Sequence, residues 1–442
     1  MEIWSRRSFL RNAALAGGSL VLPGGVLLSC KKTPPTPSKV LSWEEKTDRP
    51  HYFVFYYMIG GWDLMLTTDP MEKGIAGALV PYEKEEIIEV GAHRFGPAMA
   101  PVQDFMDKMA IIKGIYVRAL NHPQARFRLV TGKFKPPFTT PAASIQTLLA
   151  DEYKDRYAIP NLSGDSMRPQ VFRGPEDLKL EPLRVRSIQQ LKALASVEGS
   201  TAAYQDEIKA AIRQRDEWMQ GKYPNHPLVA EFGDFAQLAH AANQGHYPDL
   251  VEAAEADMNT VTSATGRNAD QARLAVETIR QDLAPCVTVG TGEFDSHTAN
   301  QYRNHARNVI RGMKTVGQIA KGLQESVLSD GSNLLDHTTI VVSSEFSRDP
   351  AKNELGGKHH WSTNSMILIG KGVKTNPERG VPTVWGRTDE NLAALPINPK
   401  NGSSEEGAVD LEITYPLATI LAMKGIDPVP HLGVEAIPDL LG

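Results

Sequence analysis

The chain contains five short apolar runs, which predict buried β-strands. They cover residues 52–59, 109–115, 286–290, 338–342 and 366–369. The runs are rich in Val, Ile, Tyr and Phe and do not alternate apolar with polar positions, as expected for strands that are covered on both faces. Strands of this kind are typical of parallel sheets.

Helical stretches lie between these runs, for example at 142–153, 300–328 and 414–423. The alternation of strand and helix predicts an α/β fold with a mainly parallel sheet flanked by helices. We expect this domain to span residues 51–442.

The pattern changes between about 160 and 284, where strand signals nearly vanish. Amphipathic helical stretches dominate there, at 202–219, 227–242 and 269–283. We interpret this range as a helical insertion or cap on the sheet domain.

The N-terminus carries two motifs of an exported protein. Arg6 and Arg7, followed by Phe-Leu, match the twin-arginine export consensus. The apolar stretch that follows is too short and too rich in glycine for a good membrane span, and it ends in Leu-Leu-Ser before Cys30, which resembles a lipobox. We predict that residues 1–29 are a signal peptide and that Cys30 is lipidated. The alternatives are a simple transmembrane anchor, or a cleaved signal that leaves Cys30 without a role.

The residues after Cys30 indicate where the protein is held. Two lysines follow, with no aspartate to retain a lipoprotein in the inner membrane, so in a bacterium with two membranes we expect the outer membrane or a periplasm-facing position. Residues 30–50 are rich in proline and predict an extended linker between the anchor and the body.

Composition limits the class of protein. The 442 residues are 41% hydrophobic and 22% charged, with a net charge of −5, which describes an ordinary globular chain. The mature region has no basic tract, so nucleic acid is not an expected partner. Acylation of Cys30 would leave Cys286 as the second and last cysteine, without a partner for a disulfide. We predict that Cys286 is a buried strand residue.

Polar side chains follow the first and third predicted strands, where open α/β sheets bind ligands. Asp63, in Gly-Gly-Trp-Asp, is a candidate metal ligand or, alternatively, a turn or helix-capping residue. Asp295 and His297, in Gly-Glu-Phe-Asp-Ser-His, could offer an oxygen and a nitrogen to one divalent ion. Alternatively, Asp295 caps the following helix and His297 hydrogen-bonds to it.

Two more polar clusters accompany the fourth and fifth strands. In Ser-Ser-Glu-Phe-Ser-Arg, Glu345 is a candidate ligand or base and Arg348 a candidate clamp for an anion, or the two form a structural pair. In Gly-Gly-Lys-His-His-Trp, His359 and His360 form a metal signal in a glycine-rich loop. We expect one of these two histidines to support the other or to face solvent.

These motifs, in this order and after a twin-arginine signal, resemble the bacterial family named domain of unknown function 1501, over about residues 52–425. That family is similar to the alkaline phosphatase and sulfatase superfamily, which has an α/β core with one or two divalent metals at the strand ends. The resemblance implies metal-ligand roles for Asp63, Asp295, His297 and His360. Glu345 stands where the superfamily usually has an Asp-His pair.

The segment 122–132 resembles the sulfatase nucleophile signature. Arg126 and the Thr-Gly that ends the segment keep their places, while Pro123 stands one position early and His122 takes the nucleophile position. A helix starting at Pro123 would direct its free amide groups to that position, which favours anions. His122 is therefore a candidate nucleophile, metal ligand or base, or else it caps the helix.

Two functions follow from these residues. The first is a divalent-metal hydrolase outside the cytoplasm that acts on a phosphate or sulfate ester or a related anionic substrate, with zinc as the first choice of metal and calcium, magnesium or manganese as alternatives. Arg126 or Arg348 would steady the anion. The second is a non-catalytic binding or assembly module on a decayed enzyme fold, which recognises a cell-envelope component and reaches the membrane through its lipid anchor.

Overall fold

The computed structural model describes residues 43–75, 77–133, 142–157, 159–164, 180, 182–185, 214, 222, 267–376, 378 and 380–442. The chain divides into two compact units, Met1–Glu45 with Gln189–Glu255 and Lys46–Ile188 with Ala256–Gly442. Every element below belongs to the second unit. The export motif with Arg6 and Arg7, Cys30, and the predicted helices 202–219 and 227–242 lie outside the described residues, so these remain predictions.

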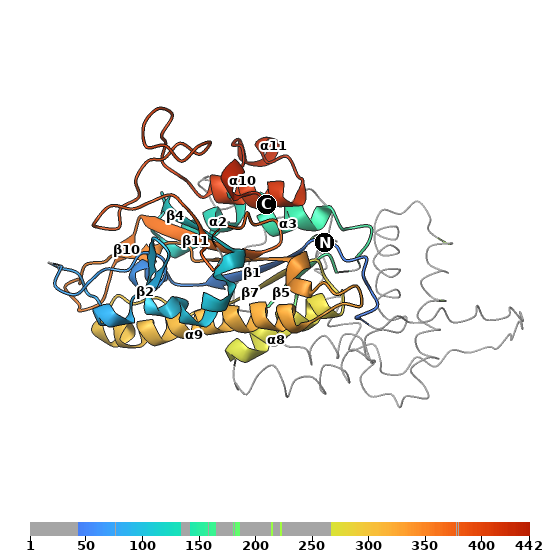
Figure 1. Ribbon diagram of the computed structural model, residues 1–442, viewed down its shortest axis with the longest axis horizontal. Coiled ribbons are helices and arrows are strands. Elements are labelled where there is room, and N and C mark those ends of the chain that lie inside the picture. Colours follow the sequence, from blue (N-terminus) through green and yellow to red (C-terminus); the bar gives the residue numbers. More distant parts are fainter. Residues whose placement is uncertain are drawn as a thin grey trace, which may run out of the picture. The chain divides into compact units, whose positions relative to one another are not determined.

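An eight-stranded sheet with the order β12-β4-β11-β8-β1-β7-β5-β6 forms the centre of this unit (Figure 1). Only β11 runs antiparallel to the strands beside it, so the predicted, mainly parallel sheet is confirmed. The strands are β1 (Tyr52–Met58), β4 (Met109–Tyr116), β5 (Asn161–Ser163), β6 (Leu183–Arg184), β7 (Cys286–Thr291), β8 (Thr338–Ser343), β11 (Thr363–Gly370) and β12 (Thr383–Trp385).

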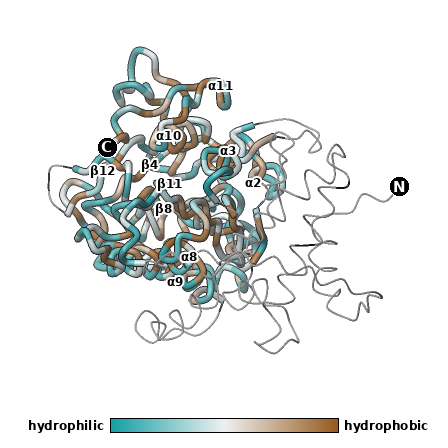
Figure 2. Tube along the Cα trace, turned by 90° about the vertical axis from the view of Figure 1, so that its right-hand side faces the viewer, coloured by the Kyte–Doolittle hydropathy of each residue, from teal (hydrophilic) through white to brown (hydrophobic). Residues whose placement is uncertain are grey.

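The apolar runs became strands because both faces of the sheet are covered. All seven residues of β1, Tyr-Phe-Val-Phe-Tyr-Tyr-Met, are buried, and β7 and β8 on its two sides are buried along their whole length. Hydrophobic segments accordingly lie in the middle of the layers (Figure 2). Cys286 is fully buried at the start of β7, as predicted.

Helices pack on both faces of the sheet (Figure 1). One face carries α8 (Arg267–Arg280), α9 (Ala299–Glu325) and the 3-10 helix η3 (Pro97–Lys108), and the other carries α2 (His122–Thr131), α3 (Ile145–Asp151), α10 (Thr414–Lys424) and α11 (Val429–Leu432). The start of α9 is fixed by a capping box in which the side chains of Thr298 and Gln301 bond each other's backbone amides. These helices supply the layers that cover the strands.

Part of the range predicted as a helical insertion belongs to the sheet domain. β5 and β6 extend the sheet beyond β7, and α8 packs against β7 and α9. Both strands are too short to give an apolar run, so the absence of a strand signal there was misleading. The rest of the range 160–284 lies almost entirely outside the described residues, and its helical character remains a prediction.

Smaller elements complete the unit. β2 (Ile88–Val90) pairs with β3 (His93–Phe95), and β9 (Ser347–Arg348) pairs with β10 (His360–Trp361). Short 3-10 helices are η1 (Leu64–Leu66), η2 (Lys84–Glu86), η5 (Leu334–His337) and η6 (Pro438–Leu440). In the described part of the chain, no helix has both the length and the apolar character needed to cross a membrane.

Candidate metal centre

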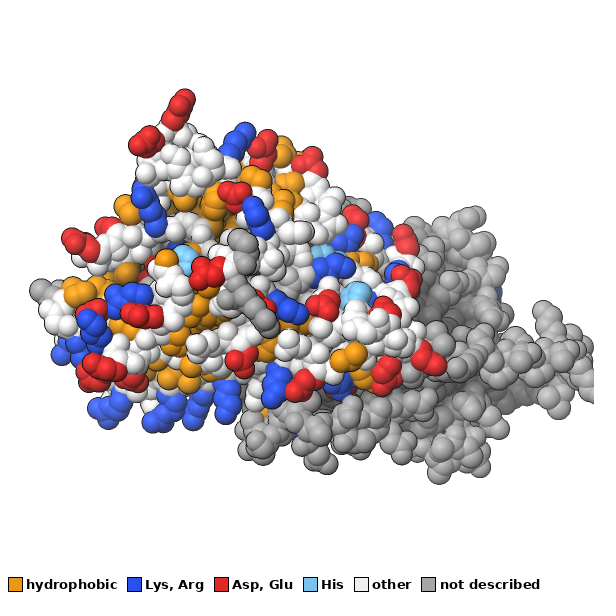
Figure 3. Space-filling model, in the orientation of Figure 1, with side chains coloured by type: hydrophobic (Ala, Val, Ile, Leu, Met, Phe, Trp, Pro, Cys, Tyr) orange, Lys and Arg blue, Asp and Glu red, His pale blue; other side chains and the backbone are white. Residues whose placement is uncertain are grey.

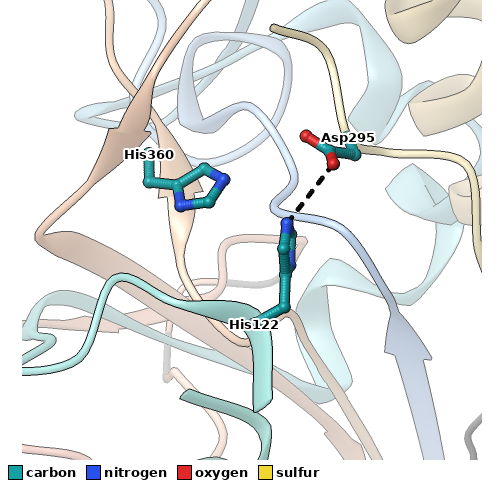
Figure 4. Close-up of side chains that lie close together, drawn as sticks. All are labelled: His122, Asp295 and His360. Atoms are coloured by element: carbon teal, nitrogen blue, oxygen red, sulfur yellow. Dashed lines mark ion pairs between the residues drawn. The ribbon is translucent and has the colours of Figure 1, made fainter. Parts of the chain in front are cut away.

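The predicted polar clusters meet at one edge of the sheet. Asp295 and His297 follow β7, and Glu345 follows β8. His360 lies in β10, just before β11, and because β11 runs antiparallel to its neighbours, its start lies at the edge where the parallel strands end. His122 enters from the first residue of α2, and Figure 4 shows it with Asp295 and His360.

His122 does not cap its helix. Asn121 is the N-cap and accepts a hydrogen bond from the amide of Gln124, which leaves the imidazole of His122 free to turn toward the site. Its Nδ1 lies 2.8 Å from Oε1 of Glu345, and its Nε2 lies 3.4 Å from Oδ2 of Asp295. A carboxylate only accepts, so Nδ1 donates and Nε2 presents a lone pair to Asp295 when the ring is neutral.

His360 is held in the same way by a backbone carbonyl. Its Nδ1 is hydrogen-bonded to the carbonyl oxygen of Leu120, which can only accept, so the proton is on Nδ1 and Nε2 has the lone pair. Burial lowers the pKa of His360 to about 4, and its imidazole is therefore neutral near pH 7. A histidine whose second nitrogen donates to a carbonyl or carboxylate has the orientation typical of metal ligands.

Asp295 is the charged member of the group. Burial alone would raise the pKa of its carboxyl, but the charge of Arg348 and a 2.8 Å hydrogen bond from its guanidinium outweigh that effect and hold the pKa below its usual value. The carboxylate also lies 3.2 Å from Nε2 of His297. Its side chain remains 45% exposed, so the group is open to solvent and to a ligand.

The donor set fits a divalent cation. Ligand atoms of His122, Asp295 and His360 all lie within 4.8 Å of one another in the described part of the chain. Neighbouring ligands on a tetrahedral ion are about 3.4 Å apart for bonds of about 2.0 to 2.2 Å, so a modest rotation of the side chains would suffice. Nε2 of His297 lies 2.9 Å from Nε2 of His360 and donates its proton there, so His297 offers a fourth nitrogen to an ion as the tautomer with the proton on Nδ1. Two nitrogens and a carboxylate oxygen are a donor set that suits zinc.

Glu345 is a buried carboxylate that contacts His122 beside the candidate ligands. Its side chain is fully buried and accepts hydrogen bonds from the amide of Gly60, the hydroxyl of Ser344 and Nε of Arg126, in addition to His122. Burial would raise its pKa, but the hydrogen bond from His122 and the charge of Arg126 lower it below the usual value. Because all its neighbours donate to it, Glu345 acts as the residue that orients His122 rather than as an open ligand.

Asp63 differs from its predicted role as a metal ligand. It is completely buried, its Oδ2 lies 2.6 Å from Nζ of Lys358, and its Oδ1 accepts the amide of Met65 at the start of η1. Both oxygens are thus engaged, and the ammonium of Lys358 supplies the positive charge that an ion would have supplied. The capping role, which the sequence left open, is the observed one.

Arg348 also differs from the predicted anion clamp. Its guanidinium is buried and donates to the carbonyl oxygens of Gly60, Gly61 and Lys358, besides its pair with Asp295. It therefore fixes the loop after β1 against the loops that carry Asp295 and His360. Arg126 is the arginine that faces solvent: Nε bonds Glu345, and the side chain is 35% exposed.

Two further residues of the site gave no usable signal in the sequence. In the sequence, Lys358 looks like an ordinary charged loop residue. The structure shows that it pairs with Asp63. The ring of Phe346 stacks on His360, with centroids 4.2 Å apart, and lies 4.8 Å from the ring of His122. Gly61, with φ of 87°, is required here because a Cβ would lie 2.7 Å from the ring of Phe346.

A family described as "Protein of unknown function (DUF1501)" matches residues 52–390. The chain belongs to this family. The matched range includes every residue of the candidate metal centre, as the order of the motifs predicted. Among curated proteins, no sequence matches this chain.

Several solved structures are similar to the chain at low sequence identity. Ps i-CgsB in complex with k-i-k-neocarrahexaose shares 10% identity over 88% of this chain and 75% of its own, with a TM-score of 0.40. PsFucS1 sulfatase from Pseudoalteromonas sp. shares 12% sequence identity over 87% of this chain and 69% of its own, with a TM-score of 0.38. The lipoteichoic acid synthase LtaP from Listeria monocytogenes shares 8% sequence identity over 82% of this chain and 76% of its own, with a TM-score of 0.33. These values are low, so the fold assignment rests on the sheet topology described above.

Proposed function

We propose that this protein is an exported, lipid-anchored hydrolase that uses one divalent metal ion to cleave a phosphate or sulfate ester or a related anionic substrate. One observation carries the proposal. Nε2 of His122 and the carboxylate of Asp295 face each other at 3.4 Å while Nδ1 of His122 is occupied by Glu345. Lone pairs that face each other call for a cation between them or a second proton on the imidazole.

In this proposal His122, Asp295 and His360 hold the ion, with His297 as a fourth donor. A bound divalent ion would polarise an ester oxygen of the substrate and stabilise the charge that develops during hydrolysis. Glu345 and the carbonyl of Leu120 hold the two imidazoles with their Nε2 atoms toward the ion. This assigns His122 as a ligand rather than as a nucleophile.

Arg126 provides the contact for the anionic group of the substrate. Its Nε is fixed on Glu345, its side chain is partly exposed to solvent, and it lies one turn after His122 on α2. In the described residues, no hydrogen bond or ion pair of its terminal nitrogens is found, so both can donate to a phosphate or sulfate oxygen. Arg348, which is buried and fully bonded, is left out of this role.

Export and anchoring rest on the sequence motifs alone. Arg6 and Arg7 support the twin-arginine route, which carries folded proteins and thus suits a chain that acquires a metal before export. Cys30 supports lipid attachment in the cell envelope, with an outer-membrane or periplasm-facing position.

Metal analysis of the purified protein is the decisive test. We expect about one divalent ion per chain, lost in His360→Ala and kept in His359→Ala, which removes the neighbouring, exposed histidine that pairs with Glu354. Aryl phosphates and aryl sulfates would then be offered to both variants and to the parent before and after treatment with a chelator. Turnover that survives the chelator and His360→Ala would overturn the proposal.

A binding module is the second candidate because protein groups alone can balance the charge of the cluster. Arg348 already neutralises Asp295 at 2.8 Å, and an imidazolium at His122 would complete the charge balance. This candidate predicts a folded protein that contains no stoichiometric metal and does not hydrolyse the esters, with His360→Ala leaving both results unchanged.

A further inference from the structure

A row of basic side chains runs along the exposed face of α9. Arg303, Arg307, Arg311 and Lys314 are all exposed, and Lys321 continues the row. At about 100° per residue, these positions lie within roughly 80° of one another around the helix, over about 27 Å of its length. Figure 3 shows blue side chains in a line along the lower edge of the molecule, where α9 runs in Figure 1.

The row is not part of an internal ion-pair network. In the described part of the chain, no acidic group lies within 4.0 Å of the side-chain nitrogens of Arg303, Arg307, Arg311 or Lys314, and Lys321 has only Glu325 at 3.7 Å. Of the acidic residues on the elements packed against α9, Asp336 pairs with Lys108, Glu277 with Arg280 and Asp270 with Arg273. Asp104 and Asp107 on η3 form no ion pair within 4.0 Å in the described part of the chain. This concentration of positive charge stands out in a chain whose net charge is −5.

An apolar side chain lies in the middle of the row. Ile310 is 40% exposed and falls between Arg307 and Arg311 in sequence and on the same face of the helix. The opposite face of α9 is buried, with His305, Val309, Met313 and Val316 turned inward. The helix is therefore fixed in the body and presents one straight line of cations with an isoleucine among them.

We propose that this face of α9 rests on an anionic phospholipid surface. A flat bilayer is the partner that all cations of a straight row reach at once, and each Lys or Arg close to such a surface contributes attraction that salt weakens. Ile310 fits the apolar boundary just below the headgroups. The contact orients the body on the membrane, and it does not depend on the metal centre.

Vesicle binding tests this proposal in the full chain carrying Cys30→Ala, so that acyl chains do not dominate. Vesicles of phosphatidylcholine with phosphatidylglycerol should bind the protein at low salt, and those of phosphatidylcholine alone should not. Arg307→Gln with Arg311→Gln should lower the partition coefficient about 30-fold, as expected for the loss of two charges near the surface. Lys374→Gln with Lys400→Gln, an equal change of charge in the C-terminal segment, should have little effect.

Three results would overturn the proposal. The first is equal binding of the parent to both kinds of vesicle, and the second is an unchanged partition coefficient in the α9 double variant. The third is retention of the parent on dextran sulfate that the α9 variant loses while vesicle binding stays the same, which would assign the row to an anionic polysaccharide. Thermal unfolding of each variant confirms that the exchanged surface residues leave the fold intact.

Discussion

The ammonium of Lys358 lies 2.6 Å from the carboxylate of Asp63, and both side chains are completely buried. Removing one member of such a pair leaves an uncompensated charge in the interior. We expect Lys358→Met to lower the free energy of unfolding by about 3 to 5 kcal/mol, measured by urea denaturation.

The exposed pair of Lys374 and Asp439 provides the control. Lys374→Met should change the free energy of unfolding by less than about 1 kcal/mol, because surface pairs are screened by solvent. Asp63→Asn combined with Lys358→Met should recover part of the loss. A single Lys358→Met variant as stable as the Lys374 control would show that the buried pair is not needed for stability.

Glu345 predicts an effect on metal affinity without direct contact to the ion. Glu345→Gln keeps the shape of the side chain but weakens its hold on Nδ1 of His122 and on Arg126. We expect the affinity for zinc to fall about 10- to 100-fold, measured by competition with a chromogenic chelator. Glu354→Gln, which alters the exposed partner of His359, should leave it unchanged. Equal zinc affinities in the two variants would show that Glu345 does not orient His122 for metal binding.

His305 should make stability depend on pH. It is fully buried on α9, and burial, followed by the charges of Arg348 and Lys358, lowers its pKa from 6.5 to about 3. Below pH 6.5 the imidazole of His305 binds a proton in the unfolded chain but stays neutral in the folded chain. The free energy of unfolding therefore falls as the pH drops toward 3. Between pH 7 and 5 this histidine should contribute a loss of about 2 kcal/mol.

The variant His305→Leu isolates that contribution. In metal-free protein, the difference between the free energies of unfolding at pH 7 and pH 5 should be smaller in His305→Leu than in the parent by the amount given above. His359→Leu, a change at an exposed histidine, should keep the difference of the parent. If His305→Leu and the parent lose stability in parallel, another group controls the acid sensitivity.

The proposed lipid anchor predicts a defect in maturation. Cys30→Ala should leave a precursor that is not cleaved and is not labelled by a fatty-acid analogue in growing cells. Arg6→Lys with Arg7→Lys should instead retain folded precursor in the cytoplasm, which separates the two motifs. Labelling of the Cys30→Ala protein at the parental level would exclude lipidation at this cysteine.

The five long strands could be predicted because each contains a short run of mostly apolar residues, and the polar loops beside them identified most of the site. The direction of β11 could not, since an apolar run looks the same in either direction. The sequence also left open which histidine of the adjacent pair faces the site. In the structure His360 turns to Leu120 and His297, while His359 stays half exposed beside Glu354.

The roles of Asp63 and Arg348 depended on partners that are distant in the chain. The pairs Asp63–Lys358 and Arg348–Asp295 form only when β1, β7, β8 and β11 have assembled. No spacing in the sequence predicts these contacts. A carboxylate after a strand suggests a ligand equally well whether or not an ammonium lies beside it. Ion pairs between distant parts of the chain are therefore the part of the site that requires the structure.

The order of strands in the sheet also sets the timing of biosynthesis. β1 leaves the ribosome first, yet its partner β7 lies about 230 positions later and β8 later still. At about 5 to 20 residues per second, the apolar segment of β1 waits roughly 10 to 50 seconds for its first partner strand. During that interval the segment lacks its partner strands, and under the proposed twin-arginine export the translocase, which carries folded proteins, would have to engage the chain later. The proposed export would thus depend on synthesis of the C-terminal half of the chain, which supplies β7 and β8.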